Sequence, residues 1–139
     1  MLRRGAILVA AAAVLLSGTP VVQAQTLDYD QFKKTVMPIF VTKRPGYTRC
    51  VVCHTGANNA MRMPAMNPGA TAWDEAQART MFETVSRVVT PGKPDESHLL
   101  LYPLVPQEGG SAYHSGGRQW PSKSDPAWQT IARWVKGEK

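Results

Sequence analysis

Cys50-Val51-Val52-Cys53-His54 is the stretch from which the fold of this chain can be argued. Its two cysteines are the only cysteines among 139 residues, and its histidine is one of three. Residues three apart share one face of a helical turn, so the two thiols point the same way with an imidazole beside them. The sequence therefore concentrates all of its thiol chemistry in a single turn.

This Cys-x-x-Cys-His spacing is the attachment signature of a c-type haem. Each thiol can bond one vinyl-derived carbon at the porphyrin edge, and the adjacent imidazole is then directed beneath the ring toward the iron. The sequence predicts one covalent haem c per chain, bound through Cys50 and Cys53, with His54 as the proximal iron ligand.

Three other kinds of site can use the same residues. A thioredoxin-like redox pair requires a βαβ context, and no strand is predicted before Cys50. A structural disulfide closing so short a loop constrains the unfolded chain little. A zinc site requires four ligands, so that two or more histidines have to join from elsewhere in the chain. We favour haem attachment over these alternatives.

Residues 1–24 have the pattern of a secretory signal peptide. Two arginines precede a short apolar run, and the segment ends in Val22-Gln23-Ala24. The run is shorter than the roughly 20 apolar residues that span a bilayer, although an uncleaved membrane anchor is the alternative. We expect export to the periplasm, cleavage near Ala24, and no transmembrane span in the mature chain.

The mature segment, residues 25–139, is the length of one small domain. Without Arg3 and Arg4, 14 basic and 10 acidic side chains leave a net charge of +4. The basic residues are scattered singly, which argues against nucleic-acid binding. The charge instead favours acidic redox proteins as partners, through electrostatic steering.

Apolar periodicity predicts a mostly α fold, a small helical domain with long loops wrapped around the haem. Helices are expected over 28–37, 72–89, 97–101 and 126–136, with Thr71 as N-cap of the second and Pro38 ending the first. Long loops are expected over 56–70 and 103–124, and no pair of strands is predicted.

Further segments carry a family resemblance. They are Pro91 to Leu100, His114-Ser115-Gly116-Gly117, and the tryptophans Trp128 and Trp134 of the last helix. With the Cys50–His54 motif, they make the chain resemble the mono-haem class I cytochromes c, and more narrowly the small exported domains of planctomycete and acidobacterial type. The resemblance covers essentially the mature chain and implies a cytochrome c domain over residues 25–139. Unlike better-known class I proteins, this chain has no methionine in the loop before the last helix.

His114 is the first choice for the sixth iron ligand. It follows His54 by 60 residues, in the loop before the last helix, where the class I fold brings its distal ligand. Gly116 and Gly117 would allow the backbone to approach the ring closely.

Met61, Met63 and Met66 are the second choice, because the chain can reach the far side of the ring at about 3.5 Å per residue. They can equally be core side chains, a common role of methionine. His98 is a third candidate, and an open site is the fourth. A second imidazole gives a lower potential than a thioether.

Several apolar and aromatic residues are expected to line the haem. They are Phe40, Tyr47, Leu99, Leu100, Trp120, Trp128 and Trp134. Arg118, Trp120 or Lys123 could donate hydrogen bonds to the haem propionates.

The expected function is single-electron transfer between redox partners or to a membrane respiratory complex. No Ser-His-Asp set, phosphate loop or carboxylate pair is evident, so no catalytic residue is assigned and the chain is not expected to be an enzyme by itself. Two alternatives remain open: a haem with an open distal site for a gas or peroxide, and a haem subunit fixed in a larger respiratory or dehydrogenase complex.

Overall fold

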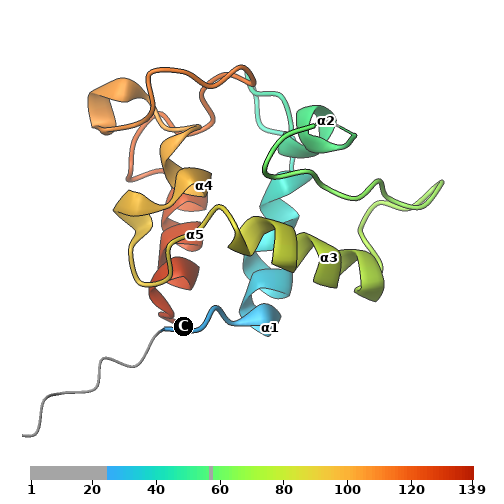
Figure 1. The fold of residues 1–139 in the computed structure, drawn as a ribbon. Helices are drawn as coiled ribbons and strands as arrows, with labels where there is room; N and C mark the ends of the chain where they lie inside the picture. Colours follow the sequence, from blue (N-terminus) through green and yellow to red (C-terminus); the bar gives the residue numbers. More distant parts are fainter. Residues whose placement is uncertain (1–24, 57) are drawn as a thin grey trace, which may run out of the picture.

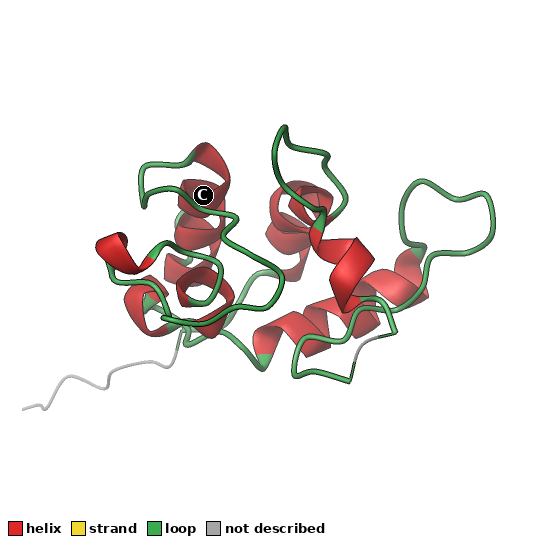
Figure 2. Ribbon diagram, turned by 90° about the horizontal axis from the view of Figure 1, so that it is seen from above, coloured by secondary structure: helices red, strands yellow, loops and turns green. Residues whose placement is uncertain are grey.

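Helices joined by long loops make up the described part of the chain, residues 25–56 and 58–139 of a computed structural model. The elements are α1 (Tyr29–Gln31), η1 (Phe32–Val36), η2 (Met37–Phe40), α2 (Cys50–His54), α3 (Glu75–Ser86), η3 (Pro94–Glu96), α4 (His98–Leu101), η4 (Pro106–Glu108) and α5 (Pro126–Lys136). Within these ranges only isolated β-bridges occur, and no strand is drawn in Figure 2. The prediction of a mostly α fold is confirmed, whereas the predicted signal peptide lies outside the described residues.

The first helical run continues three residues beyond its predicted end. Asp28 caps it by accepting a hydrogen bond from the Gln31 N–H at 2.8 Å. Pro38 was expected to stop the run near Met37, but the chain passes from a π-turn into a 3-10 turn and remains helical to Phe40. Proline lacks an N–H, yet it stands in the first turn of η2, where no intrahelical donor is needed.

Helix α3 begins three residues later than predicted. Asp74, not Thr71, is its N-cap, because Asp74 and Gln77 form a reciprocal capping box with bonds of 2.9 and 3.1 Å. Two orphan N–H groups are satisfied in this way. The indole of Trp73 is thereby left outside the helix, where it is buried and donates to the Pro64 carbonyl at 2.8 Å.

The core is centred on the packing of α5 against η1. The rings of Phe32 and Trp134 lie 5.3 Å apart, and both side chains are fully buried. The Trp134 indole also donates to the Asp28 carbonyl at 2.9 Å, which ties α5 to the start of the first helical run. The two ends of the described chain consequently lie side by side (Figure 1).

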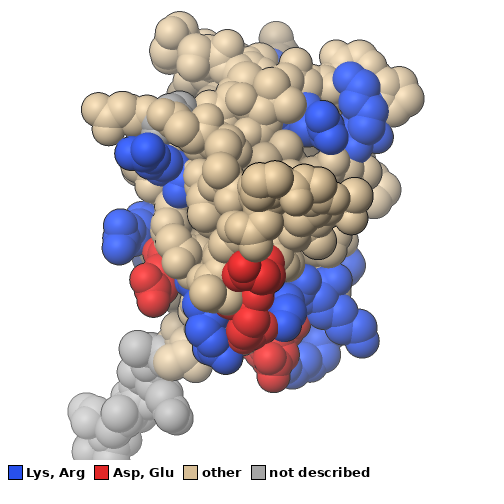
Figure 3. All heavy atoms as spheres, turned by 90° about the vertical axis from the view of Figure 1, so that its right-hand side faces the viewer, with Lys and Arg blue, Asp and Glu red and all other residues tan. Residues whose placement is uncertain are grey.

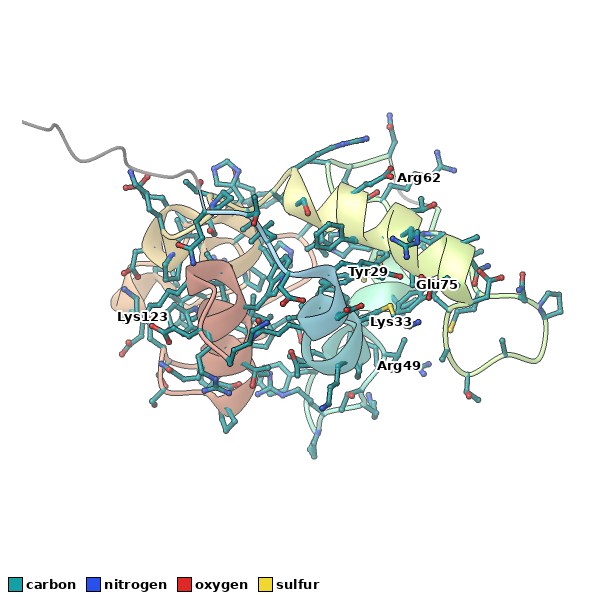
Figure 4. All side chains as sticks on the ribbon, turned by 90° about the horizontal axis from the view of Figure 1, so that it is seen from below. Tyr29, Lys33, Arg49, Arg62, Glu75 and Lys123 are labelled. Carbon is teal, nitrogen blue, oxygen red and sulfur yellow. The ribbon has the colours of Figure 1, made fainter. Side chains whose placement is uncertain are left out.

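Helix α3 joins this core through aromatic contacts. The Phe82 ring lies 5.4 Å from Phe32 and 5.3 Å from Tyr29. At the surface, the Tyr29 hydroxyl donates to Glu75 at 3.0 Å, and Lys33 pairs with the same carboxylate (Figure 4). Exposed ion pairs contribute about 0–1 kcal/mol, so the buried rings are the stronger link between α3 and the N-terminal run.

None of the helices in the described part of the chain is long and apolar enough to cross a membrane.

Replacing Trp134 by Ala should lower the free energy of unfolding by about 3–5 kcal/mol, because a fully buried ring is lost and the Asp28 carbonyl loses its donor. Urea unfolding followed by circular dichroism measures this change. Lys34→Ala, at an exposed position of η1, is the control and should change stability by less than about 0.5 kcal/mol. Equal losses for both variants would show that α5 is not central to the core.

Candidate functional site

A cavity of about 370 Å³ lies between α2, α4 and the loop that carries His114. Its walls come from Cys53 and His54 of α2, from the segment 59–61, from Val88, from His98, Leu99, Tyr102 and Pro103, and from residues 114–116. A smaller hollow of about 30 Å³ shares Cys53, His54 and His114 with it and adds Phe40, Cys50 and Trp120. The cavity volume is typical of sites that hold a large organic ligand.

Helix α2 presents both thiols of the motif at these hollows. Its single turn is anchored by Val51, which is buried, and by the hydrogen bond from Met63 N–H to the His54 carbonyl at 3.0 Å. Cys53 is exposed at the rim and Cys50 is half-buried. No disulfide joins the two cysteines, both of which are described.

Burial raises the pKa of the Cys50 thiol to about 11. The thiol is therefore protonated at neutral pH and is a poor nucleophile. Reactive redox cysteines have the opposite property, a lowered pKa. In addition, no strand precedes α2 in the described residues. Both observations argue against the thioredoxin-like alternative.

The His54 imidazole is held by hydrogen bonds at one nitrogen only. Its Nδ1 lies 3.0 Å from the Met61 carbonyl oxygen and 3.2 Å from Oδ1 of Asn59. Both oxygens can only accept, so Nδ1 carries the proton. The lone pair is then on Nε2, to which no described residue donates, and this nitrogen is available to a metal. A hydrogen bond at the rear nitrogen is the usual arrangement of a metal-binding histidine.

His114 is oriented in the same manner by its own turn. Its Nδ1 lies 2.5 Å from the Gly117 carbonyl oxygen, and Gly117 N–H donates back to the His114 carbonyl at 3.0 Å. Gly117 has φ of +80°, and a Cβ at Gly116 would lie 3.1 Å from Cε1 of His114. The two glycines thus provide both the turn and the space for the ring, and Nε2 again has no partner in the described chain.

The two imidazoles both line the cavity and lie near each other as a stacked pair. Their ring centroids are 6.4 Å apart and their planes differ by 20°. An imidazole nitrogen binds a first-row metal at about 2 Å, with the ring centroid about 1.1 Å behind it, so two imidazoles on opposite sides of one metal have centroids about 6 Å apart. The observed separation fits this arrangement.

The methionine candidates lie in different places. Met61 is half-buried and lines the cavity, but its own carbonyl is bonded to the rear nitrogen of His54, so its main chain lies behind that imidazole. Met63 is buried in the core, and Met66 packs against the core outside the cavity lining. His98 lines the cavity at its exposed side and stacks on Tyr102 at 4.7 Å.

The predicted lining residues also separate into two groups. Phe40 and Trp120 line the smaller hollow, and Leu99 lines both. The others lie away from the linings: Leu100, Trp128 and Trp134 are in the core, and Tyr47 lies beneath the Arg44 guanidinium at 4.8 Å.

A part-buried ion pair supports the Trp120 wall of the smaller hollow. Arg44 pairs with the buried carboxylate of Asp125, donates to the Gln119 carbonyl at 2.7 Å and stacks 5.5 Å from the Trp120 ring. The Trp120 indole N–H is buried with no acceptor. An unsatisfied buried donor costs about 1–3 kcal/mol.

The other two predicted propionate donors have partners of their own. Arg118 donates to the Tyr102 and Ala112 carbonyls at 3.0 and 2.7 Å, which fastens the His114 loop to the end of α4. Lys123 pairs with Asp95 at 2.7 Å.

The described residues include every cysteine and histidine of the chain, and among them no group of three or more His, Cys, Asp or Glu side chains gathers as metal ligands. They do not provide the four ligands of the zinc alternative.

Two features of the site have no counterpart among the sequence predictions. One is the Arg44–Asp125 pair, which joins residues 81 positions apart. The other is Asn59, whose place behind His54 depends on the path of the 55–63 loop. The Asn58-Asn59 pair is a turn signal, but it does not by itself indicate which ring the turn contacts.

No protein-family model matches this chain, and no curated protein or solved structure is significantly similar to it.

Arg44→Met should lower the free energy of unfolding by about 2–4 kcal/mol, because it leaves the buried Asp125 carboxylate without its cation. Chemical denaturation measures the loss. Lys33→Met makes the same change in an exposed pair with Glu75 and should cost about 1 kcal/mol or less. If the two variants lose the same stability, the Arg44 pair is no more than a surface contact.

Proposed function

We propose that this protein is an exported c-type cytochrome that carries single electrons through one haem c bound by residues of a cytochrome c-like domain, 25–139. The observation that carries the proposal is the pair of imidazoles, His54 and His114, whose centroids lie 6.4 Å apart beside the Cys50–Cys53 turn, each with its Nε2 free of hydrogen bonds from the described residues. Each of these features is what a tethered, six-coordinate iron requires.

Each residue of the site has one role in this proposal. Cys50 and Cys53 would hold the haem through thioether bonds, and His54 and His114 would supply imidazole ligands to its iron. The haem supplies an iron that cycles between the ferrous and ferric states. Because both imidazoles are held by carbonyl acceptors behind them, little nuclear rearrangement accompanies the change of charge. No catalytic acid or base is needed.

The Trp120 wall supports the same reading. Trp120 lines the hollow that also contains Cys50, Cys53 and His54, and its buried indole N–H has no acceptor. A propionate oxygen that reached this N–H would satisfy it, while the charge of the neighbouring Arg44 is already balanced by Asp125. Two imidazole ligands favour a lower reduction potential than a thioether ligand.

Charge around α2 favours an acidic redox protein as the partner. The chain has no acidic residue over 31–73 or 109–124, the two stretches that provide α2 and the His114 loop. Figure 3 draws the right-hand side of the molecule in Figure 1, and acidic side chains lie only in the lower half of this face. Helix α2 lies in the upper half in Figure 1. The excess of basic over acidic residues in these stretches attracts an acidic surface over several ångströms, and exposed Cys53 would place the haem edge close to it.

Purified from an exporting host, the protein should contain one c-type haem per chain by the pyridine haemochrome assay. After denaturation and reduction it should show no free thiol, because both cysteines are consumed in thioether bonds. The reference is the Cys50→Ser/Cys53→Ser double variant made in the same host, which should contain no covalent haem. Two free thiols and no haem in the unaltered protein would reject the proposal in favour of a disulfide.

The ligand assignment has its own test. His114→Ala should convert the oxidised protein from a low-spin to a high-spin spectrum, and added imidazole should restore the low-spin form. Met61→Leu, at the same cavity, and His98→Ala serve as controls and should remain low-spin. A sulfur-to-iron charge-transfer band that disappears in Met61→Leu would identify Met61 as the ligand instead. A high-spin spectrum in the unaltered protein would indicate an open site for a gas or peroxide.

A further inference from the structure

Asn59 is an exposed residue of the cavity wall, and one oxygen of its side chain accepts two hydrogen bonds. Its Oδ1 accepts from the Met61 N–H at 3.0 Å, which closes an Asx-turn over residues 59–61. The same oxygen lies 3.2 Å from Nδ1 of His54. The Met61 carbonyl, which this turn orients, is the other acceptor of that nitrogen at 3.0 Å. The His54 N–H is therefore shared between two oxygens that both depend on Asn59.

We propose that Asn59 is a positioning residue that sets the electron donation of His54 to the bound iron, and through it the reduction potential. This inference rests on the proposed function. The Asn59 side chain fixes the Nδ1–H tautomer and so leaves the lone pair of Nε2 facing the cavity. The stronger the acceptors behind Nδ1, the more negative charge the imidazole carries and the better it stabilises ferric iron.

Asn59 is the acceptor through which this effect can be changed. The Met61 oxygen and the Gly117 oxygen behind His114 belong to the main chain, so a side-chain substitution leaves their chemistry unaltered. Asn59 instead offers a neutral amide oxygen, and aspartate can replace it in the same shape. Aspartate also forms Asx-turns, so the substitution adds charge while retaining the turn.

The test compares three variants of the haem-loaded protein at one pH. Asn59→Asp places a carboxylate on the His54 N–H, and Asn59→Ala removes the acceptor. Asn58→Asp adds the same charge one residue earlier, at an exposed position that makes no hydrogen bond with His54. Each is measured by spectroelectrochemical titration, and the His54 Nδ1–H resonance of the reduced protein is followed by NMR.

The two Asn59 variants should shift the potential in opposite directions. At a fixed electrode potential, the ferric-to-ferrous ratio should rise about tenfold in Asn59→Asp relative to Asn58→Asp, because charge reaches the iron through the imidazole. In Asn59→Ala the ratio should fall about two- to threefold below that of the unaltered protein. The Nδ1–H resonance should move downfield in Asn59→Asp only.

Each other result overturns the inference. Equal ratios in Asn59→Asp and Asn58→Asp would mean that the charge acts through space alone. Shifts of Asn59→Asp and Asn59→Ala in the same direction would mean that Asn59 merely maintains the loop. In both cases the haem is present and the proposed function stands. Absence of covalent haem from the unaltered protein would overturn both.

Discussion

The separation of the His54 and His114 imidazoles is the constraint on which the rest of the site depends. The two rings come from chain positions 60 residues apart, yet their centroids stand 6.4 Å from each other in nearly parallel planes. Each ring is anchored from behind by hydrogen bonds, His54 by Met61 and Asn59 and His114 by Gly117.

The helical core supplies the rigidity that this spacing requires. The contact between Phe32 and Trp134 joins the two ends of the domain, and Phe40 extends the same aromatic cluster to the wall of the smaller hollow. On the opposite side, Arg118 fastens the His114 loop to the chain just after α4. A loop ligand can thus be as well placed as a helix ligand, since its backbone is hydrogen-bonded to the core at defined points.

The polar groups around the cavity are of two kinds, hydrogen-bond acceptors behind the histidines and a buried donor at Trp120. Oxygen acceptors lie at Nδ1 of each histidine and leave the lone pair on Nε2, the nitrogen that would bind a metal. In the proposed haem protein they would stabilise ferric iron. At Trp120 there stands a buried donor without an acceptor, next to a cation whose charge Asp125 balances. An iron porphyrin has the matching parts, a central metal and peripheral carboxylates. The proposal of a haem protein therefore draws on several independent groups as well as on the Cys50–His54 motif.

By itself the sequence determined the elements whose signals are local: the turn that aligns Cys50 with Cys53, the capped α5, and the mostly α class. These follow from residue spacing, caps and helical periodicity, which act within a few residues. Only the tertiary structure decided that the His114 ring lies near the His54 ring while Met63 is buried in the core, and that Asn59 is bonded to Nδ1 of His54. Those outcomes depend on how long loops fold back onto the core, and contacts between distant residues leave no local pattern in a single sequence.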